Sequence, residues 1–190
     1  MDREFEANEA LGNLTEDPSF RVRTRALAAL GRFGNREAEQ KLLSMLQSPL
    51  EEERIEVVRA LDHCPRDIGY LLRILESESS IDVQIAAVRS LGRLANPQAV
   101  RPLVARLQDP HLKFFCADAL GKLGAPEAIP PLLDLIERET NSLIRRTAII
   151  ALGKIGPPLQ IESLLRYLEA PNLAPAVVEV LCSLGGQNAE

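Results

Sequence analysis

The chain has 190 residues, of which 46% are hydrophobic and 26% charged, so it carries too many apolar side chains to be a disordered protein. Only 4% of the residues are aromatic and none is Trp, and an apolar content made mostly of Leu, Ile, Val and Ala favours an all-α fold over a β-sandwich. The formal net charge of −5 argues against nucleic acid or an anionic membrane as a partner, because phosphate binding needs concentrated Lys and Arg.

The predicted elements form a repeat flanked by two caps. The first is an N-terminal helix over residues 3–14, within a cap of residues 1–16. Residues 17–169 then contain five helix pairs with a period of 29 to 32 residues. A last helix over residues 172–185 forms a terminal half-repeat within residues 170–190. Every repeat places a Leu in the same column, and these leucines are Leu30, Leu61, Leu91, Leu120, Leu152 and Leu184.

Each repeat is predicted to fold as two antiparallel helices joined by a tight turn. A small residue precedes the column Leu in every repeat, and a Gly follows it in all repeats but the second. These small residues allow neighbouring helices to approach closely. A further Gly, at Gly34, Gly124 and Gly156, is expected to take the left-handed conformation that ends a helix. The second helix of a pair carries two adjacent apolar residues that face the same core. These residues are Leu42 and Leu43, Leu103 and Val104, Leu132 and Leu133, and Leu164 and Leu165.

Such pairs bury their apolar faces by stacking on one another. We therefore expect residues 1–190 to form one continuous array without a domain boundary. The expected architecture is a right-handed α-solenoid of about five helix pairs with helical caps.

One segment of the repeat resembles a known family. Residues 109–136, DPHLKFFCADALGKLGAPEAIPPLLDLI, are similar to the HEAT-like repeat of phycobilisome lyases. The residues that carry the resemblance are Asp109, Pro110, Lys113, Ala119, Leu120, Gly121, Gly124, Ala128, Ile129, Pro130 and Leu132. The resemblance extends over nearly the whole chain and implies a HEAT/armadillo-type solenoid. Members of the E/F type work as heterodimers that attach bilin to, or detach it from, phycobiliproteins. No residue of this chain matches a catalytic lyase signature, so no catalytic position is assigned.

The beginning of the chain and its cysteines bear on localisation. The first residues, MDREFEANEA, lack the basic and then apolar order of a signal peptide, and no apolar run approaches the ~20 residues that span a bilayer. The three cysteines show no C-x-x-C spacing, which favours free thiols in a reducing compartment. We therefore expect a cytoplasmic protein that does not insert into membranes.

The turn that lacks the column Gly is irregular, and it contains Asp62, His63, Cys64 and Asp67. In one interpretation, His63 assists a thiolate at Cys64 or steers the cysteine of a partner. In the other, Cys64 is a small core residue, because the same column holds apolar residues in other repeats. Those residues are Phe33, Leu94, Leu123 and Ile155. The core interpretation is preferred, since adjacent residues of a helix point about 100° apart.

The other two cysteines lie in different kinds of column. Cys116 shares its column with Ala26, Ala87 and Ala148 and is predicted to lie in the core. Cys182 lies in a variable column of the last helix, where partial exposure is expected.

Basic residues recur eight positions before the column Gly, at Arg23, Arg54, Lys113 and Arg145, while Gln84 and Val177 interrupt the series. Such a row either holds an acidic partner or joins neighbouring units through carboxylates and inter-repeat loops, and the structural interpretation is preferred.

The second helices of HEAT arrays line the concave side, where Arg and Tyr among polar residues are typical of a recognition surface. The expected contact residues are Arg73, Arg101, Arg106, Arg166 and Tyr167, with a merely solvated face as the alternative. The last helix is either a second docking patch or a simple end cap. Its apolar residues are Val177, Val178, Val180 and Leu181.

These observations favour a protein-binding scaffold, adaptor or assembly factor without cofactor or catalytic residue. The only histidines are His63 and His111 and no His-Glu dipeptide occurs, so neither a metal site nor the resemblance to HEAT-type iron hydroxylases is supported. The alternative is a subunit of a heterodimeric bilin lyase or a phycobiliprotein-handling factor. Only under that alternative is bilin a cofactor, with a related HEAT-repeat chain or a phycobiliprotein as partner.

Overall fold

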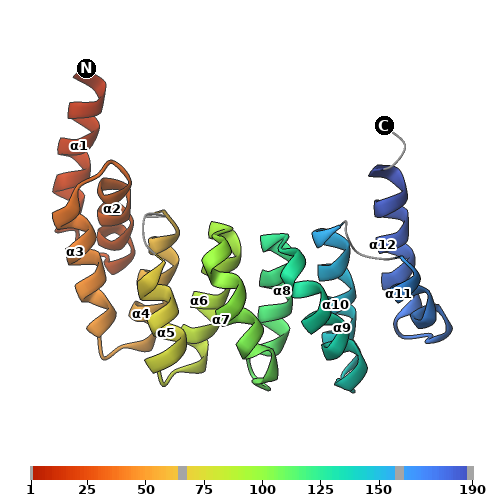
Figure 1. Ribbon diagram of the computed structural model, residues 1–190. Coiled ribbons are helices and arrows are strands. Elements are labelled where there is room, and N and C mark those ends of the chain that lie inside the picture. Colours follow the sequence, from red (N-terminus) through yellow and green to blue (C-terminus); the bar gives the residue numbers. More distant parts are fainter. Residues whose placement is uncertain (1, 64–67, 157–160, 188–190) are drawn as a thin grey trace. The chain divides into compact units, whose positions relative to one another are not determined.

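A computed structural model of the protein describes residues 2–63, 68–156 and 161–187. Among these residues every regular element is a helix and no strand occurs, which confirms the all-α prediction (Figure 1). The chain divides into two compact units, Met1–Ser90 and Leu91–Glu190. The boundary falls within one helix, and the expectation of a single uninterrupted array stays a prediction.

The first unit holds the N-terminal cap and the first helix pairs. Its elements are α1 (Asp2–Leu14), α2 (Phe20–Arg32), α3 (Arg36–Ser44), η1 (Met45–Gln47), α4 (Glu51–Ala60), η2 (Leu61–His63), α5 (Gly69–Ser77) and the first part of α6 (Ile81–Leu94). Helix α2 packs against α1, α3 and α4. The expected cap helix over residues 3–14 is confirmed by α1.

The second unit continues the same pattern of short 3-10 turns and α-helices. Its elements after α6 are η3 (Pro97–Ala99), α7 (Val100–Ala105), η4 (Arg106–Gln108), α8 (Lys113–Leu123), η5 (Pro126–Ala128), α9 (Ile129–Arg138), α10 (Ser142–Ile155), α11 (Glu162–Leu165), η6 (Arg166–Glu169) and α12 (Ala174–Gln187). Helix α10 packs against α8, α9 and α12. Helix α12 confirms the expected last helix, with bounds shifted by two residues.

The helix pairs stack through the columns read from the sequence. All six column leucines are buried, with at most 6% of each residue exposed. A Cβ atom placed on Gly121 of α8 would lie 2.7 Å from the Cα of Ala151 on α10, and one placed on Gly92 would lie 3.0 Å from the Cα of Ala119. At these two interfaces the column Gly of one repeat meets the small residue of the next, and this combination lets the two backbones approach closely.

Gly34, Gly124 and Gly156 follow helices with positive φ angles of 92°, 62° and 70°. The left-handed conformation is confirmed at Gly124, where ψ is 26°, whereas Gly156 has a ψ of −149° and ends its helix in a different conformation that also favours Gly. Ala95 takes a positive φ of 52° after α6, where the sequence offers no Gly. This conformation costs an L-residue about 1–2 kcal/mol relative to a right-handed one. The turn after α6 therefore keeps a positive φ although its residue is Ala and not Gly.

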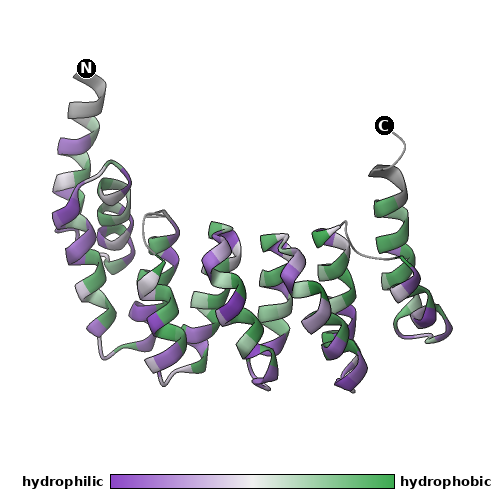
Figure 2. Cartoon of the chain, viewed as in Figure 1, coloured by the Kyte–Doolittle hydropathy of each residue, from purple (hydrophilic) through white to green (hydrophobic). Residues whose placement is uncertain are grey.

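Hydrophobic and hydrophilic residues alternate along the helices (Figure 2). In the apolar pairs of the second helices, the first member is always fully buried, namely Leu42, Leu103, Leu132 and Leu164. Cys116 is fully buried as predicted, and burial raises the pKa of its thiol to about 12. Cys182 is exposed, which agrees with the expectation for the last helix.

Candidate protein-binding surfaces

The recurrent basic residues serve mainly to hold loops onto helices. In the first unit, Nη1 of Arg23 donates to the carbonyl oxygens of Asp17 and Pro18 at 2.8 and 3.0 Å. Gln84, which interrupts the basic series, makes the same kind of contact through Nε2 to the carbonyl oxygen of Glu78 at 2.6 Å. The amide thus preserves the loop contact without the charge.

The second unit repeats the arrangement. Lys113 forms an ion pair with Glu139, and Nε of Arg145 donates to the carbonyl oxygen of Ile136 at 2.9 Å. The contacts of Arg23, Lys113 and Arg145 agree with the structural interpretation of the basic series, in which these residues join loops to helices.

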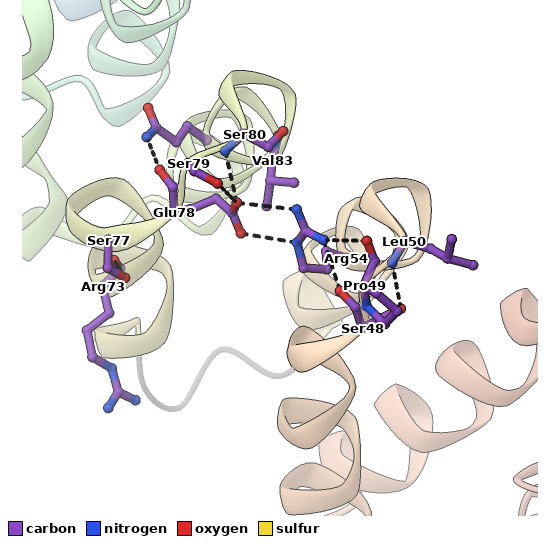
Figure 3. A network of polar contacts seen from close by, with 11 residues as sticks. Ser48, Pro49, Leu50, Arg54, Arg73, Ser77, Glu78, Ser79, Ser80 and Val83 are labelled. Atoms are coloured by element: carbon purple, nitrogen blue, oxygen red, sulfur yellow. Dashed lines mark hydrogen bonds and ion pairs between the residues drawn. The ribbon is translucent and has the colours of Figure 1, made fainter.

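Arg54 combines both kinds of contact in one network (Figure 3). Its Nη1 donates to the carbonyl oxygen of Ser48 at 2.9 Å, while Nε and Nη2 reach the carboxylate of Glu78 at 3.2 and 3.3 Å. The Arg54 and Glu78 side chains are only 16% and 15% exposed. The backbone N–H of Ser80 donates to the same carboxylate at 2.9 Å. The loop before α6 is thereby tied to α4.

This network makes stability depend on pH. Burial alone would raise the pKa of Glu78, but the N–H of Ser80 and the Arg54 guanidinium outweigh it and hold the pKa below its ordinary value of 4.5. A depressed folded-state pKa means that Glu78 stabilises the fold above about pH 4.5 and loses this effect as the pH falls through the folded-state value. We expect Glu78→Gln to cost about 1–2 kcal/mol at neutral pH and less in acid, as measured by urea unfolding at a series of pH values.

The matched control for Glu78→Gln is Glu76→Gln, since Glu76 is an exposed residue of α5, the helix that ends just before Glu78. Its substitution should leave the pH dependence of unfolding unchanged. If both variants gave the same pH profile, the Arg54 network would not contribute in the way described.

The expected contact residues occupy different surroundings. Arg73 is exposed on α5, and its guanidinium points away from the Glu78 network (Figure 3). Arg101 is exposed on α7 and lines a cleft of about 620 Å³ that also includes Glu127. Arg106 is half-buried, with Nη1 4.0 Å from Oδ2 of Asp109. Arg73 and Arg101 thus present their charges to solvent, whereas Arg106 serves partly to hold its own loop.

The structure brings Arg166 and Tyr167 together around Glu137 of α9. Nη2 of Arg166 lies 2.9 Å from Oε1 of Glu137, and its guanidinium lies 5.0 Å from the centroid of the Tyr167 ring. The hydroxyl of Tyr167 donates to the same oxygen at 2.5 Å, and burial together with this hydrogen bond raises the pKa of Tyr167 to about 12. Only 5% of Tyr167 is exposed. The expectation of a surface tyrosine therefore differs from the structure, in which the ring supports helix packing.

Exposed apolar side chains precede and follow Arg166 in the sequence. Leu165 and Leu168 are 45% and 38% exposed, and Ile161 is 37% exposed. The sequence pattern placed Leu165 with the core-facing pair of its helix, but α11 spans only Glu162–Leu165 and the second residue of the pair turns outward. Arg166 and these residues lie between positions 161 and 168, and we call this segment with its mixed exposed side chains the α11 patch.

The last helix is covered more fully than its composition suggested. Val177 and Val180 are buried, and a Cβ atom on Gly153 of α10 would lie 2.6 Å from Cγ2 of Val180. Leu181 is half-buried, so only Val178, at 50%, is a largely exposed member of this apolar group. The arrangement favours the end-cap interpretation over a docking patch.

The irregular turn is described only in part. Asp62 is half-buried, whereas Cys64 and Asp67 lie outside the described residues, as does the side chain of His63. The column argument for a buried Cys64 is weaker than the alignment suggested. Phe33, in the same column, is 55% exposed, whereas Ile155 is buried. Burial in this column depends on which neighbouring turn covers it.

Sequence reasoning missed a cleft of about 720 Å³ between α2 and α4 in the first unit. It is lined by Arg21, Arg25, Ala29, Arg32, Phe33, Glu56, Arg59 and Ala60, and we call it the arginine cleft. The available signal was the spacing of Arg21, Arg25 and Arg32, which share one face of a helix at i, i+4 and i+11. The net negative charge of the whole chain gave no indication of this local positive charge.

Glu56 lies at the centre of the arginine cleft. Oε1 of Glu56 is 3.5 Å from Nε of Arg21 and 3.8 Å from Nε of Arg25, and Oε2 is 3.9 Å from Nη1 of Arg59. The Glu56 side chain is 13% exposed, whereas those three arginine side chains are 69%, 68% and 61% exposed. One sheltered carboxylate thus gathers three guanidinium groups that remain accessible to solvent.

Two searches of the described residues bear on other kinds of site. In residues 2–63, 68–156 and 161–187, no helix has the length and apolar character needed to cross a membrane. In the same residues, no group of three or more His, Cys, Asp or Glu side chains is arranged to hold a metal ion.

Comparison with curated proteins finds relatives that are longer than this chain. The chain is 33% identical over 131 residues to phycocyanobilin lyase subunit alpha of Synechococcus elongatus, a match that covers 68% of this chain and 40% of that protein. It is 32% identical over 110 residues to deoxyhypusine hydroxylase of Gallus gallus, covering 56% of this chain and 35% of that protein. The chain therefore spans well under half the length of either relative.

Solved structures share the fold at lower identity. A chain in the structure of the two-chain complex of phycocyanin lyase from Nostoc matches this chain with a TM-score of 0.59 and 23% identity. The match covers 94% of this chain and 77% of the matched chain. Human deoxyhypusine hydroxylase in complex with glycerol matches with a TM-score of 0.56 and 21% identity. This match covers 95% of this chain and 74% of the hydroxylase chain. At such identities the likeness shows the fold alone, an α-solenoid.

The repeat itself identifies the family. Residues 5–67, 68–148 and 109–182 match the family model for HEAT repeats. Together these segments include all the column leucines except the last, and they cover the helix pairs whose Gly and Ala contacts were described above. The chain belongs to the HEAT-repeat family.

Proposed function

We propose that the chain is a subunit of a pigment-handling complex of the bilin lyase type, in which it acts together with another protein. The observation that carries this proposal is the 33% identity over 131 residues to phycocyanobilin lyase subunit alpha. The structural likeness to a phycocyanin lyase complex of two chains supports a protein partner. In this proposal a second chain completes the pigment site.

The surfaces described above suit a partner-binding role. Arg101 beside its cleft on α7 and Arg166 in the α11 patch are exposed cations, and the α11 patch also carries exposed apolar side chains. Interfaces draw affinity from this mixture, since Arg supplies directed hydrogen bonds while apolar contacts exclude water. In this proposal the chain positions a phycobiliprotein or its pigment, and no catalytic residue is assigned to it.

The proposal is tested by titrating the purified chain with phycocyanobilin while following the absorbance of the pigment, and by size-exclusion chromatography with an apo-phycobiliprotein. We expect either a change in the bilin spectrum or co-elution of the chain with the phycobiliprotein. Both experiments are done with this chain alone and with a related HEAT-repeat chain added. Absence of both effects under both conditions would rule out pigment handling.

A second candidate is an adaptor or assembly factor that binds a protein and no pigment. The exposure of Arg73 and Arg101 on second helices favours it, because solenoids recognise partners through such residues. The double variant Arg73→Glu with Arg101→Glu should then lose a single specific partner in an affinity pull-down. Arg146→Glu, the same charge change at an exposed position of α10, should retain it.

A further inference from the structure

We propose that the arginine cleft of the first unit binds an acidic peptide segment of a partner protein. The inference does not depend on pigment handling, since it follows from the charge and shape of this cleft alone. Four of its eight lining residues are arginines and one is a glutamate, which gives the cleft a local charge of +3 in a chain whose net charge is −5. Such a concentration of one sign attracts a ligand of the other.

The guanidinium groups keep hydrogen-bonding capacity for a ligand. The contacts of Arg21, Arg25 and Arg59 with Glu56 are 3.5, 3.8 and 3.9 Å long, beyond the 2.7–3.2 Å that is typical of an N–H···O hydrogen bond. Each guanidinium carries about five N–H donors in a planar fork that fits a carboxylate. The three arginines therefore keep hydrogen-bond donors for a ligand, and Glu56 competes with that ligand for them.

The layout of the arginines favours an elongated ligand. Arg21, Arg25 and Arg32 follow one face of α2, and the eleven residues from first to last correspond to about 16 Å at the ~1.5 Å rise of a helix. An extended peptide covers this length with about five residues. A single phosphate or carboxylate reaches only one or two of these arginines, so several carboxylates in a row match the cleft better.

The apolar part of the cleft and its acidic border select a peptide over a nucleic acid. Phe33 is 55% exposed at the end of the arginine row, where it offers a surface for an apolar side chain. The neighbouring groove shares Arg21, Glu56 and Arg59 with the cleft and is also lined by Glu51, Glu52 and Glu53. This acidic border repels a long polyphosphate backbone, whereas a short acidic segment fits within the basic region.

The test uses the full chain and a short fluorescein-labelled peptide of glutamates with one central phenylalanine. Binding is followed by fluorescence anisotropy at low and high NaCl, with a glutamine peptide of the same length as the uncharged comparison. We expect saturable, salt-sensitive binding of the glutamate peptide alone. The double variant Arg25→Glu with Arg59→Glu should weaken binding by about tenfold or more, because two charge-assisted contacts become repulsive.

Two further variants separate the cleft from general charge effects. Glu56→Gln should strengthen binding several-fold, since Glu56 is the only carboxylate among the described residues that line the cleft. This opposite sign would remain informative even if the double variant folded poorly. Arg36→Glu, the same charge change at an exposed position of α3, should bind like the unmodified chain. Equal weakening by Arg36→Glu, no response to Glu56→Gln, absence of saturable binding, or tighter binding of a single-stranded oligonucleotide would each overturn the proposal.

Discussion

Replacing Leu120 by Ala is expected to lower the free energy of unfolding by about 2–5 kcal/mol. Leu120 is fully buried on α8, which packs against both α7 and α10. Removing most of its side chain leaves a cavity whose walls belong to separate helices, so the loss combines the transfer free energy with the contacts that the cavity forfeits. Urea unfolding followed by far-UV circular dichroism measures the effect.

The control for this substitution is Arg101→Ala on the preceding helix. Arg101 is exposed, and surface substitutions of this kind usually change stability by less than about 0.5 kcal/mol. The two variants should therefore differ clearly in their unfolding midpoints. Similar midpoints would contradict the assignment of Leu120 to the core and Arg101 to the surface.

Replacing Gly121 by Ala is expected to destabilise the protein by about 1–3 kcal/mol, although Ala is the better helix former. The new Cβ atom would lie 2.7 Å from the Cα and 2.8 Å from the Cβ of Ala151. These are atoms on the backbone of α10, or attached directly to it, and they cannot move unless the helix moves. The same urea titration measures the loss, which would reflect a forced separation of α8 and α10.

Gly12→Ala provides the matched comparison, because a Cβ atom at Gly12 in α1 meets nothing within 4 Å. There the gain in helix propensity is unopposed, and stability should rise by up to about 1 kcal/mol. A loss at both positions would mean that close packing is not the reason for the glycine at position 121.

The fold could be predicted from the sequence because its main determinants recur. A column Leu followed by Gly, repeated along the chain, reports both burial and the close approach of helices, and all of these leucines are buried. Gln84 shows the limit of such a pattern. The alignment counted it as an interruption of the basic series, yet its amide makes the same contact with a loop carbonyl as Arg23 does. The sequence pattern compares residue types, whereas the contact requires only a side chain that can donate a hydrogen bond.

The candidate binding surfaces were harder to predict, because exposure depends on contacts between neighbouring helices. Phe33 occupies a column that is apolar elsewhere, but it is largely exposed beside the arginine cleft. Tyr167 was expected at the surface and is instead covered, with its hydroxyl on Glu137 of another helix. Neither outcome is encoded in the periodicity of one helix, since each requires knowing which helix lies opposite.

The contacts between Gly and Ala also bear on where the protein tolerates changes in length. Gly92 and Ala119 are 27 residues apart and Gly121 and Ala151 are 30 residues apart, yet both pairs reach similarly close packing. The difference lies in the helices, since α8 begins at Lys113 and α10 begins at Ser142, which gives α10 three more residues before the small residue that meets the Gly. The first helix of a repeat can therefore change in length at its start while the buried contact near its end is retained, whereas the Gly of that contact has no such freedom.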